Sequence, residues 1–120
     1  MADVTIIHNP RCSKSRAAVA EAADLGVAVI ERRYLDEGAA LTKDELLELL
    51  AILEDAPSAL VRRDGEFPEL GLTEADLEHV EQVAELLAKH PALMERPVLV
   101  RGGRAIIGRP TDRVRPFLAG

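Results

Sequence analysis

The sequence predicts an α/β fold with one mixed four-stranded sheet, and three observations carry this prediction. A strand, a helix and a second strand fill the first 35 residues, helical repeats fill the middle, and two apolar runs flank a pair of glycines near the end. The order is therefore βαβ, then helices, then ββα. At 120 residues we expect one domain, with a sheet core from residues 1–35 and 96–120 and a helical insertion from residues 36–95.

The N-terminal unit has the pattern of a βαβ motif. Residues 4–7 are rich in β-branched side chains, which predicts a buried strand. Residues 17–25 are rich in alanine and favour a helix that ends at Gly26. An apolar run over residues 27–30 predicts a second strand, which we expect to continue to Leu35. Two strands joined in this way lie parallel, with a right-handed crossover.

The predicted insertion begins with a strong helix signal. Thr42 opens a capping box, a threonine followed three residues later by a glutamate, and it precedes leucines at helical spacing over residues 45–53. Pro57 then starts a short helical segment that leaves Arg62 and Arg63 near its end. These amphipathic stripes indicate core packing.

A second helix of the insertion follows a loop over residues 64–68. Thr73 is its predicted cap, and apolar residues at helical spacing continue until His90 and a proline stop it. Beyond it, residues 98–101 and 104–107 are apolar runs on either side of a Gly-Gly pair, which predicts an antiparallel hairpin. A short terminal helix completes the predicted fold.

Composition and charge narrow the function classes. Hydrophobic residues make up 48% of the chain, charged residues 30% and aromatic residues 2%, as in a soluble globular domain with an aliphatic core. Residues 36–95 carry 16 Asp/Glu against four Lys/Arg, whereas residues 96–120 carry six Lys/Arg against one Asp. The net charge of −6 and the few aromatic residues disfavour a nucleic-acid partner.

We expect a cytoplasmic protein without a membrane partner. No apolar run approaches the roughly 20 residues of a membrane span, and the N-terminus lacks the pattern of a signal peptide. One cysteine excludes an internal disulfide and a cysteine-rich metal site, and the three histidines show no ligand spacing, so we expect no metal and no bound cofactor.

That single cysteine, Cys12, lies where the first strand turns into the first helix. Backbone N–H groups and the helix dipole stabilise an anion at such a position. Arg11, Lys14 and Arg16 add positive charge nearby. These effects favour the thiolate, which is the nucleophilic form of cysteine, over a buried and inert thiol.

Three motifs in order resemble the glutaredoxin-coupled arsenate reductase family (ArsC-like). They are the run TIIHNPRCSKSR over residues 5–16, RPVLV over residues 96–100 and IGRP over residues 107–110. The resemblance covers nearly the whole chain and implies a thioredoxin-like fold with a helical insertion, and a cis bond before Pro97.

The resemblance also implies the roles of individual residues. Cys12 would attack the arsenic of arsenate, and Arg62, Arg96 and Arg109 would hold the oxyanion. Arg63, which is adjacent to Arg62, is the alternative for this third arginine. The roles of two further residues follow from the first motif. His8 would help to ionise the cysteine, although a structural histidine fits that position too, and the hydroxyl of Ser15 would hydrogen-bond the thiolate.

The implied function is thiol-dependent reduction of arsenate to arsenite in the cytoplasm. One protein thiol cannot form a disulfide within the chain, so a second sulfur must come from outside, from glutathione or a similar thiol and then a glutaredoxin-like protein. The alternative is a redox or protein-binding module of the same shape, such as the related regulators that bind RNA polymerase. Those typically have a Cys-x-x-Cys pair, whereas here position 15 is serine.

Overall fold

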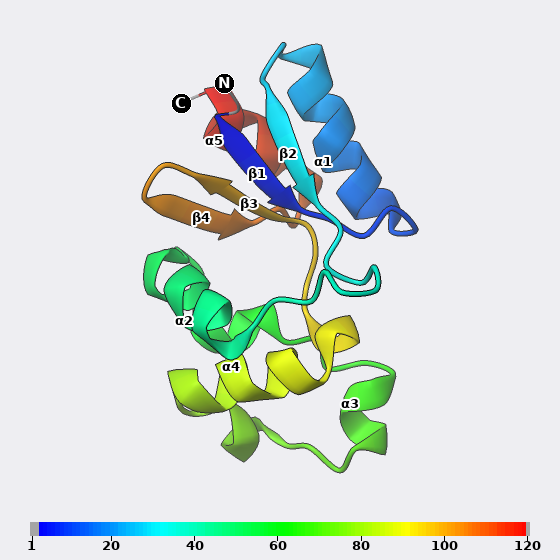
Figure 1. The fold of residues 1–120 in the computed structure, drawn as a ribbon, viewed down its shortest axis with the longest axis vertical. Coiled ribbons are helices and arrows are strands. Elements are labelled where there is room, and N and C mark those ends of the chain that lie inside the picture. The colour runs from blue at the N-terminus through cyan, green and yellow to red at the C-terminus, as the bar shows by residue number, and fades with distance from the viewer. Residues whose placement is uncertain (1–2, 120) are drawn as a thin grey trace.

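A mixed sheet of four strands organises the computed structural model, which describes residues 3–119 (Figure 1). The strands are β1 (Val4–Ile7), β2 (Val29–Arg32), β3 (Val98–Arg101) and β4 (Arg104–Ile107), in the order β2-β1-β3-β4. β1 pairs with β2 in parallel and with β3 in antiparallel fashion, and β3 pairs with β4 in antiparallel fashion. The predicted α/β fold with a mixed four-stranded sheet is therefore confirmed.

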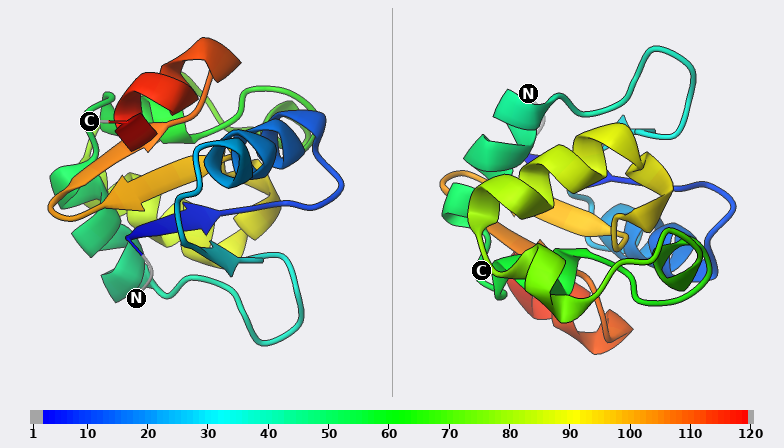
Figure 2. Two further views of the ribbon diagram at one scale, coloured as in Figure 1. Left: turned by 90° about the horizontal axis from the view of Figure 1, so that it is seen from above. Right: turned by 90° about the horizontal axis from the view of Figure 1, so that it is seen from below.

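The two faces of the sheet carry separate cores, because successive side chains of a strand point to opposite faces. Helices α1 (Ser13–Asp24) and α5 (Val114–Ala119) cover one face, as both views of Figure 2 show. The apolar side chains buried there are Val4, Ile6, Ala18, Ala22, Leu99, Ile106, Val114, Phe117 and Leu118.

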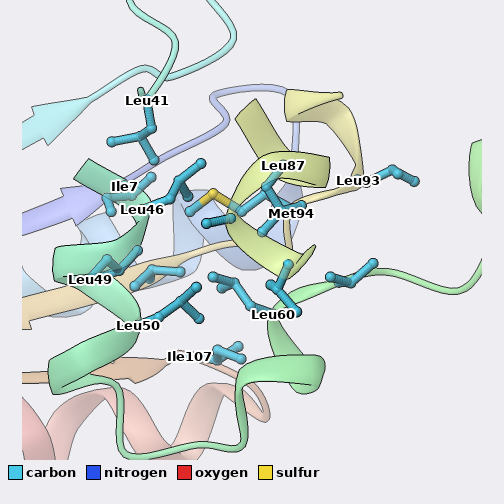
Figure 3. Close-up of a cluster of buried hydrophobic side chains, with 14 of the residues drawn as sticks. Ile7, Leu41, Leu46, Leu49, Leu50, Leu60, Leu87, Leu93, Met94 and Ile107 are labelled. Carbon is cyan, nitrogen blue, oxygen red and sulfur yellow. The ribbon is translucent and has the colours of Figure 1, made fainter. Parts of the chain in front are cut away.

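The other face packs against the helical insertion. Its main helices are α2 (Lys43–Ile52) and α4 (Val80–Lys89), and Ile7, Val98 and Ile107 of the sheet meet their leucines in a larger apolar cluster (Figure 3). Short segments link these helices: η1 (Pro57–Leu60), α3 (Glu66–Glu69), η2 (Glu74–Leu77) and η3 (Pro91–Leu93). None of the helices described within residues 3–119 is long and apolar enough to cross a membrane.

Several predicted boundaries are wrong, and the first is the start of β2, which is Val29 rather than Val27. β2 ends at Arg32 rather than Leu35, because the backbone turns there and the N–H of Tyr34 donates to the carbonyl of Arg32 (3.0 Å). The predicted loop over residues 64–68 contains part of α3. The helix expected from Thr73 onward is divided into η2 and α4. His79 is the N-cap of α4, and its backbone N–H donates a hydrogen bond to the side-chain oxygen of Gln82 (2.9 Å).

Other local predictions are confirmed. Thr42 and Glu45 form the reciprocal capping box at the start of α2. The Gly-Gly turn joins β3 to β4, and after η4 (Thr111–Arg113) the chain ends in α5. The bond between Arg96 and Pro97 is cis, as the resemblance implied, and the bond between Arg109 and Pro110 is cis as well.

Candidate functional site

Cys12 occupies the N-cap position of α1, with extended backbone angles (φ −95°, ψ 124°). The turn before it is fixed by short hydrogen bonds: the N–H of Cys12 donates to the carbonyl of Asn9 (3.0 Å), and the side-chain oxygen of Asn9 accepts from the N–H of Arg11 (3.0 Å). Because Asn9 is buried, this turn holds the sulfur at the end of the helix rather than in the core. The predicted strand-to-helix placement of the cysteine is therefore confirmed.

The surroundings of Cys12 favour its thiolate. Burial on its own raises the pKa of the thiol, but the backbone N–H groups of Ser15 and Lys14 and the guanidinium of Arg96 together hold that pKa below the ordinary value. Cys12 makes no side-chain hydrogen bond of standard cap geometry, so the two N–H groups act as nearby partial positive charges at the helix terminus.

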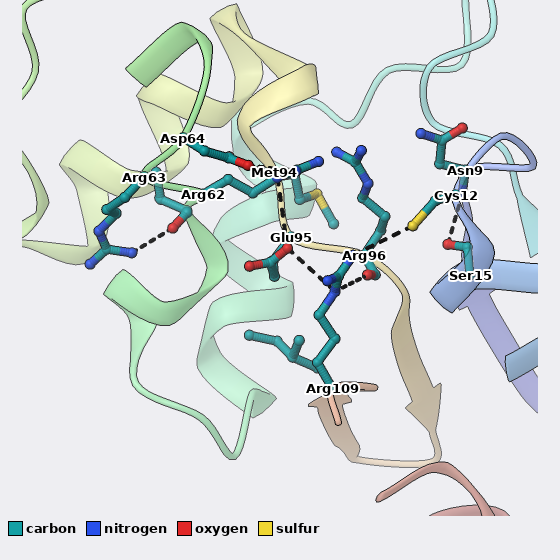
Figure 4. Close-up of polar contacts among 12 residues, drawn as sticks. Asn9, Cys12, Ser15, Arg62, Arg63, Asp64, Met94, Glu95, Arg96 and Arg109 are labelled. Atoms are coloured by element: carbon teal, nitrogen blue, oxygen red, sulfur yellow. Dashed lines mark hydrogen bonds and ion pairs between the residues drawn. The ribbon is translucent and has the colours of Figure 1, made fainter. Parts of the chain in front are cut away.

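Arg96 and Arg109 meet at this sulfur because of the register of the hairpin. Val98 pairs with Ile107, and the N–H of Gly108 donates to the carbonyl of Pro97 (2.8 Å), which extends the pairing by one step. One further step places the two arginines opposite each other. Nη2 of Arg109 donates to Sγ of Cys12 (3.4 Å), and Nε of Arg109 donates to the carbonyl of Arg96 (2.7 Å) (Figure 4).

Gly108 lies between the end of β4 and Arg109, and the side chains packed around it leave no space for a Cβ atom. A Cβ atom at this position would lie 2.7 Å from Leu99 Cδ1, 2.9 Å from Pro97 Cγ and 3.3 Å from Val114 Cγ2. Such close approach of backbone to side chains requires glycine. The packing around Gly108 therefore fixes the point at which the chain leaves the sheet toward Arg109.

Arg62 reaches the same site from the helical insertion. Val61 forms an antiparallel bridge with Met94, the N–H of Arg62 donates to the carbonyl of Leu93 (2.8 Å), and the N–H of Glu95 donates to the carbonyl of Leu60 (2.7 Å). This short ladder ties the end of η1 to the extended segment that leads into Arg96. Alternation along an extended segment then places Val61 in the core and directs Arg62 toward the cysteine.

Arg63 lies on the opposite side of that segment. Its guanidinium pairs with Glu74 (2.9 Å), donates to the carbonyl of Ser58 (2.6 Å) and stacks over the ring of Phe67 (6.0 Å to the centroid). The sequence left open whether Arg62 or Arg63 is the third arginine of the site. In the structure Arg62 lies in the cluster around Cys12 and Arg63 points away from it, and the role of Arg62 in binding the oxyanion stays a prediction (Figure 4).

Ser15 and His8 flank the cysteine without a side-chain hydrogen bond to it among the described residues. The buried hydroxyl of Ser15 accepts from the N–H of Asn9 (3.1 Å), and the backbone N–H of Ser15 is one of the groups that lower the pKa of Cys12. Nε2 of the buried His8 lies 3.5 Å from Glu31, and burial lowers the pKa of His8. The roles implied for these two side chains remain predictions.

Two residues of the cluster were not singled out from the sequence. Glu95 places one oxygen 3.5 Å from Nε of Arg109 and 3.9 Å from Nε of Arg62, so a carboxylate lies between two of the three arginines. Tyr34 is buried beside Arg96, and its hydroxyl donates to the carbonyl of Met94 (3.4 Å). Burial raises the pKa of Tyr34, so its phenol is neutral in the neutral pH range.

A cleft of about 550 Å³ opens beside this cluster. Its walls are residues 9–11, 35–36, 62, 64–66, 92–93 and 96. Within it, Arg62 is held by both carboxylate oxygens of Asp64 (2.9 and 3.2 Å). Nε of Arg96 is buried and has no hydrogen-bond partner among residues 3–119. Three guanidinium groups around a thiolate thus provide donors for a planar or tetrahedral oxyanion.

Comparison with known proteins gives consistent matches. Residues 7–117 match the model of the ArsC family. An arsenate reductase of Neisseria meningitidis is 37% identical over 123 residues, which cover 98% of this chain and 100% of that protein. The uncharacterized protein YfgD of Escherichia coli is 37% identical, with 92% of each chain covered. The structure of an arsenate reductase from Vibrio cholerae superposes with a TM-score of 0.81 at 34% identity, covering 95% of this chain and 97% of that one.

Proposed function

The chain belongs to the ArsC family, and from that premise we propose that it is an oxidoreductase that reduces arsenate to arsenite, with Cys12 as the nucleophile. The observation that carries this proposal is the convergence on one sulfur of arginines from two elements, with Nη2 of Arg109 only 3.4 Å from Sγ. The same convergence argues against a module that only binds a protein, which has no need of such a cluster.

In the proposed first step, the Cys12 thiolate attacks the arsenic atom and displaces one oxygen as hydroxide or water. Arsenate is an anion at neutral pH, so a thiolate approaches it against like charge. Arg62, Arg96 and Arg109 offset this repulsion and donate N–H groups to the oxygens. To do so, Arg62 exchanges part of its pairing with Asp64 for an oxygen of the ion. The unpartnered Nε of Arg96 is one donor that an oxygen of the ion can complete. The same donors stabilise the charge on five-coordinate arsenic in the transition state.

The second half of the reaction uses a thiol from outside the chain. Overall, arsenate and two thiols give arsenite, one disulfide and water, so arsenic gains the two electrons that the sulfurs lose. Cys12 supplies one sulfur, and the chain contains no other cysteine. We propose that glutathione or a similar small thiol supplies the other and that a glutaredoxin-like protein then regenerates Cys12 by thiol–disulfide exchange.

The decisive experiment follows arsenite formation from arsenate with glutathione, glutaredoxin and a reductase to recycle them. We expect multiple turnover with the complete system and none with arsenate alone. When glutaredoxin is withheld, a mixed disulfide on Cys12 should be visible by intact mass. Turnover by the Cys12→Ser variant, or sustained turnover with a reductant that is not a thiol, would contradict the mechanism.

A further inference from the structure

Glu95 is a carboxylate among positive charges, and its oxygens accept no hydrogen bond from them. Oε1 lies 3.5 Å from Nε of Arg109 and 3.9 Å from Nε of Arg62, so both cations attract it. Nε of Arg109 donates instead to the carbonyl of Arg96 (2.7 Å). Nε of Arg62 donates to Asp64 (3.2 Å). No other group within residues 3–119 donates to the carboxylate of Glu95, so its lone pairs are available to a donor on a ligand.

Asp64, the other carboxylate beside these arginines, differs in this respect. Its two oxygens accept from Nη2 and Nε of Arg62 (2.9 and 3.2 Å), and its side chain is 69% exposed. The side chain of Glu95 is only 24% exposed, so water competes less for its oxygens. Of the two carboxylates, Glu95 is therefore the better acceptor for a hydrogen bond from a bound ion.

Glu95 is close enough to Cys12 to contact the same ion. Arg109 connects the two, since its Nη2 donates to Sγ of Cys12 (3.4 Å) while its Nε lies 3.5 Å from Glu95 (Figure 4). The two nitrogens are bonded to one planar carbon and lie about 2.3 Å apart, so Oε1 and Sγ are at most about 9 Å apart. A tetrahedral ion in contact with Sγ and hydrogen-bonded to Glu95 spans roughly 7 Å, which fits within that limit.

The groups around the sulfur define which ligand is complementary to them. The buried Nε of Arg96 is a donor without a partner within residues 3–119, and Nη2 of Arg109 faces the sulfur. These N–H groups suit oxygens that accept, whereas Glu95 suits an oxygen that donates. Arsenate and phosphate keep a proton on an oxygen at neutral pH, whereas sulfate keeps none. An unprotonated oxygen opposite Glu95 would bring two negative charges into contact.

We propose that Glu95 determines which oxyanions bind beside Cys12, by accepting a hydrogen bond from the protonated oxygen of hydrogen arsenate or hydrogen phosphate. Sulfate has the same shape but no proton, so Glu95 repels it. A hydrogen bond to a charged group that one ion makes and the other lacks corresponds to about tenfold to a hundredfold in affinity. This role rests on the proposed function, which places an oxyanion at Cys12.

Three dianions separate the effect of the proton from the effect of charge. At about pH 8, phosphate is mainly a dianion with one O–H group, and sulfate is a dianion with none. Fluorophosphate is also a tetrahedral dianion, in which a fluorine atom replaces the O–H group and cannot donate. Each ion is titrated against the alkylation of Cys12 by iodoacetamide, and the concentration that halves the rate gives its affinity. The chain has one cysteine, so the mass of the alkylated protein reports this site alone.

We expect the wild type to bind phosphate at least about tenfold more tightly than fluorophosphate or sulfate. Glu95→Gln should tighten phosphate severalfold and the other two ions much more, because every ion escapes the repulsion and only phosphate also loses a hydrogen bond. The preference should therefore disappear, since an amide presents either an oxygen or an N–H group. Should Glu95→Gln fail to fold, Glu95→Asp, which withdraws the carboxylate by one methylene group, should weaken the preference.

Glu74→Gln is the matched control. It removes a carboxylate that pairs with Arg63 (2.9 Å) outside the site, and it should keep the wild-type preference.

The outcomes separate the role of Glu95 from the proposed function. Equal binding of phosphate and fluorophosphate by the wild type, or a preference that persists in the Glu95 variants, would overturn this role and leave the oxyanion site intact. Protection by none of the three ions would overturn both the role and the proposed function. A preference that Glu95→Gln removes, in a protein that does not reduce arsenate, would support the role of Glu95 and refute the reduction.

Discussion

The contact between Arg109 and Cys12 should favour ionisation of the thiol, in addition to the effects of Arg96 and of the N–H groups at the start of α1. Arg109→Gln removes the positive charge but keeps a polar side chain of similar reach. The guanidinium now lies 3.4 Å from Sγ, so its loss should raise the pKa of Cys12 and slow every reaction of the thiolate. Arg104→Gln is the matched control, because Arg104 begins β4, the strand that leads to Arg109. It lies about 16 Å from Arg109 along the backbone and pairs with Glu54.

The expected size follows from Coulomb's law. Two unit charges 3.4 Å apart attract by about 1.2 kcal/mol in bulk water and by about 5 kcal/mol at an effective dielectric constant of 20. Arg109 is about one third exposed (32%) and already shares its charge with Glu95, so the lower figure is the better guide. About 1.2 kcal/mol corresponds to a roughly eightfold change in the ratio of thiolate to thiol.

The assay is alkylation of Cys12 by iodoacetamide across a pH series, without sulfate or phosphate. The midpoint of the wild type should lie below that of a free cysteine, about 8.5. At pH values below the midpoint, Arg109→Gln should react roughly eightfold more slowly, whereas Arg104→Gln should follow the wild-type curve. An unchanged profile in Arg109→Gln, or a wild-type midpoint at or above that of free cysteine, would refute the electrostatic account of this site.

The other predictions concern substrate binding, packing and pH. Arg62→Lys should lower kcat/KM for arsenate at least tenfold, whereas Arg63→Lys should leave it nearly unchanged; equal losses would place both arginines, or neither, at the substrate. Glu95→Gln removes a negative charge from between two arginines and should tighten phosphate binding severalfold, measured by protection of the thiol from alkylation; weaker binding would contradict this sign. Gly108→Ala should lower the free energy of unfolding by about 1–3 kcal/mol in denaturant titration, the usual cost of overpacking, and an equally stable variant would show that the packing adjusts. The pKa of His8 is lowered in the fold, so the unfolded chain binds its proton more readily, and stability should decrease as the pH falls below about 6.5; an identical pH dependence in His8→Gln would exclude this histidine as the cause.

Local signals allowed much of the fold to be predicted. The β-branched run before Cys12, the capping box at Thr42 and the Gly-Gly turn each act over a few residues, and all three formed as expected. β2 was extended too far because Tyr34 is apolar enough to resemble a strand residue, but it is buried in a turn after the strand. The break at His79 was missed because the apolar stripe continues through it.

The candidate site depends more on contacts between distant segments. Cys12, Arg96 and Arg109 lie in recognisable motifs, but the position of Arg62 results from pairing of residues 60–62 with residues 93–95, which no local pattern specifies. Neighbouring Arg62 and Arg63 are chemically identical, so only the alternation of that paired segment separates them. Glu95 was missed for the same reason. It lies in a segment rich in acidic residues, and only its contacts in space with Arg62 and Arg109 distinguish it from the others.

The cross-strand position of Arg96 and Arg109 makes the length of the Gly102-Gly103 turn a condition for chemistry as well as for folding. Each residue added to one side of a hairpin shifts the facing pairs, and a shift by one residue turns every side chain of that strand to the opposite face. A single insertion in this turn, far from Cys12, would preserve all the residues of the site and yet separate the two guanidinium groups. Natural variation in this protein should therefore tolerate substitutions in the turn more readily than changes in its length, and insertions should accumulate in loops of residues 36–95 instead.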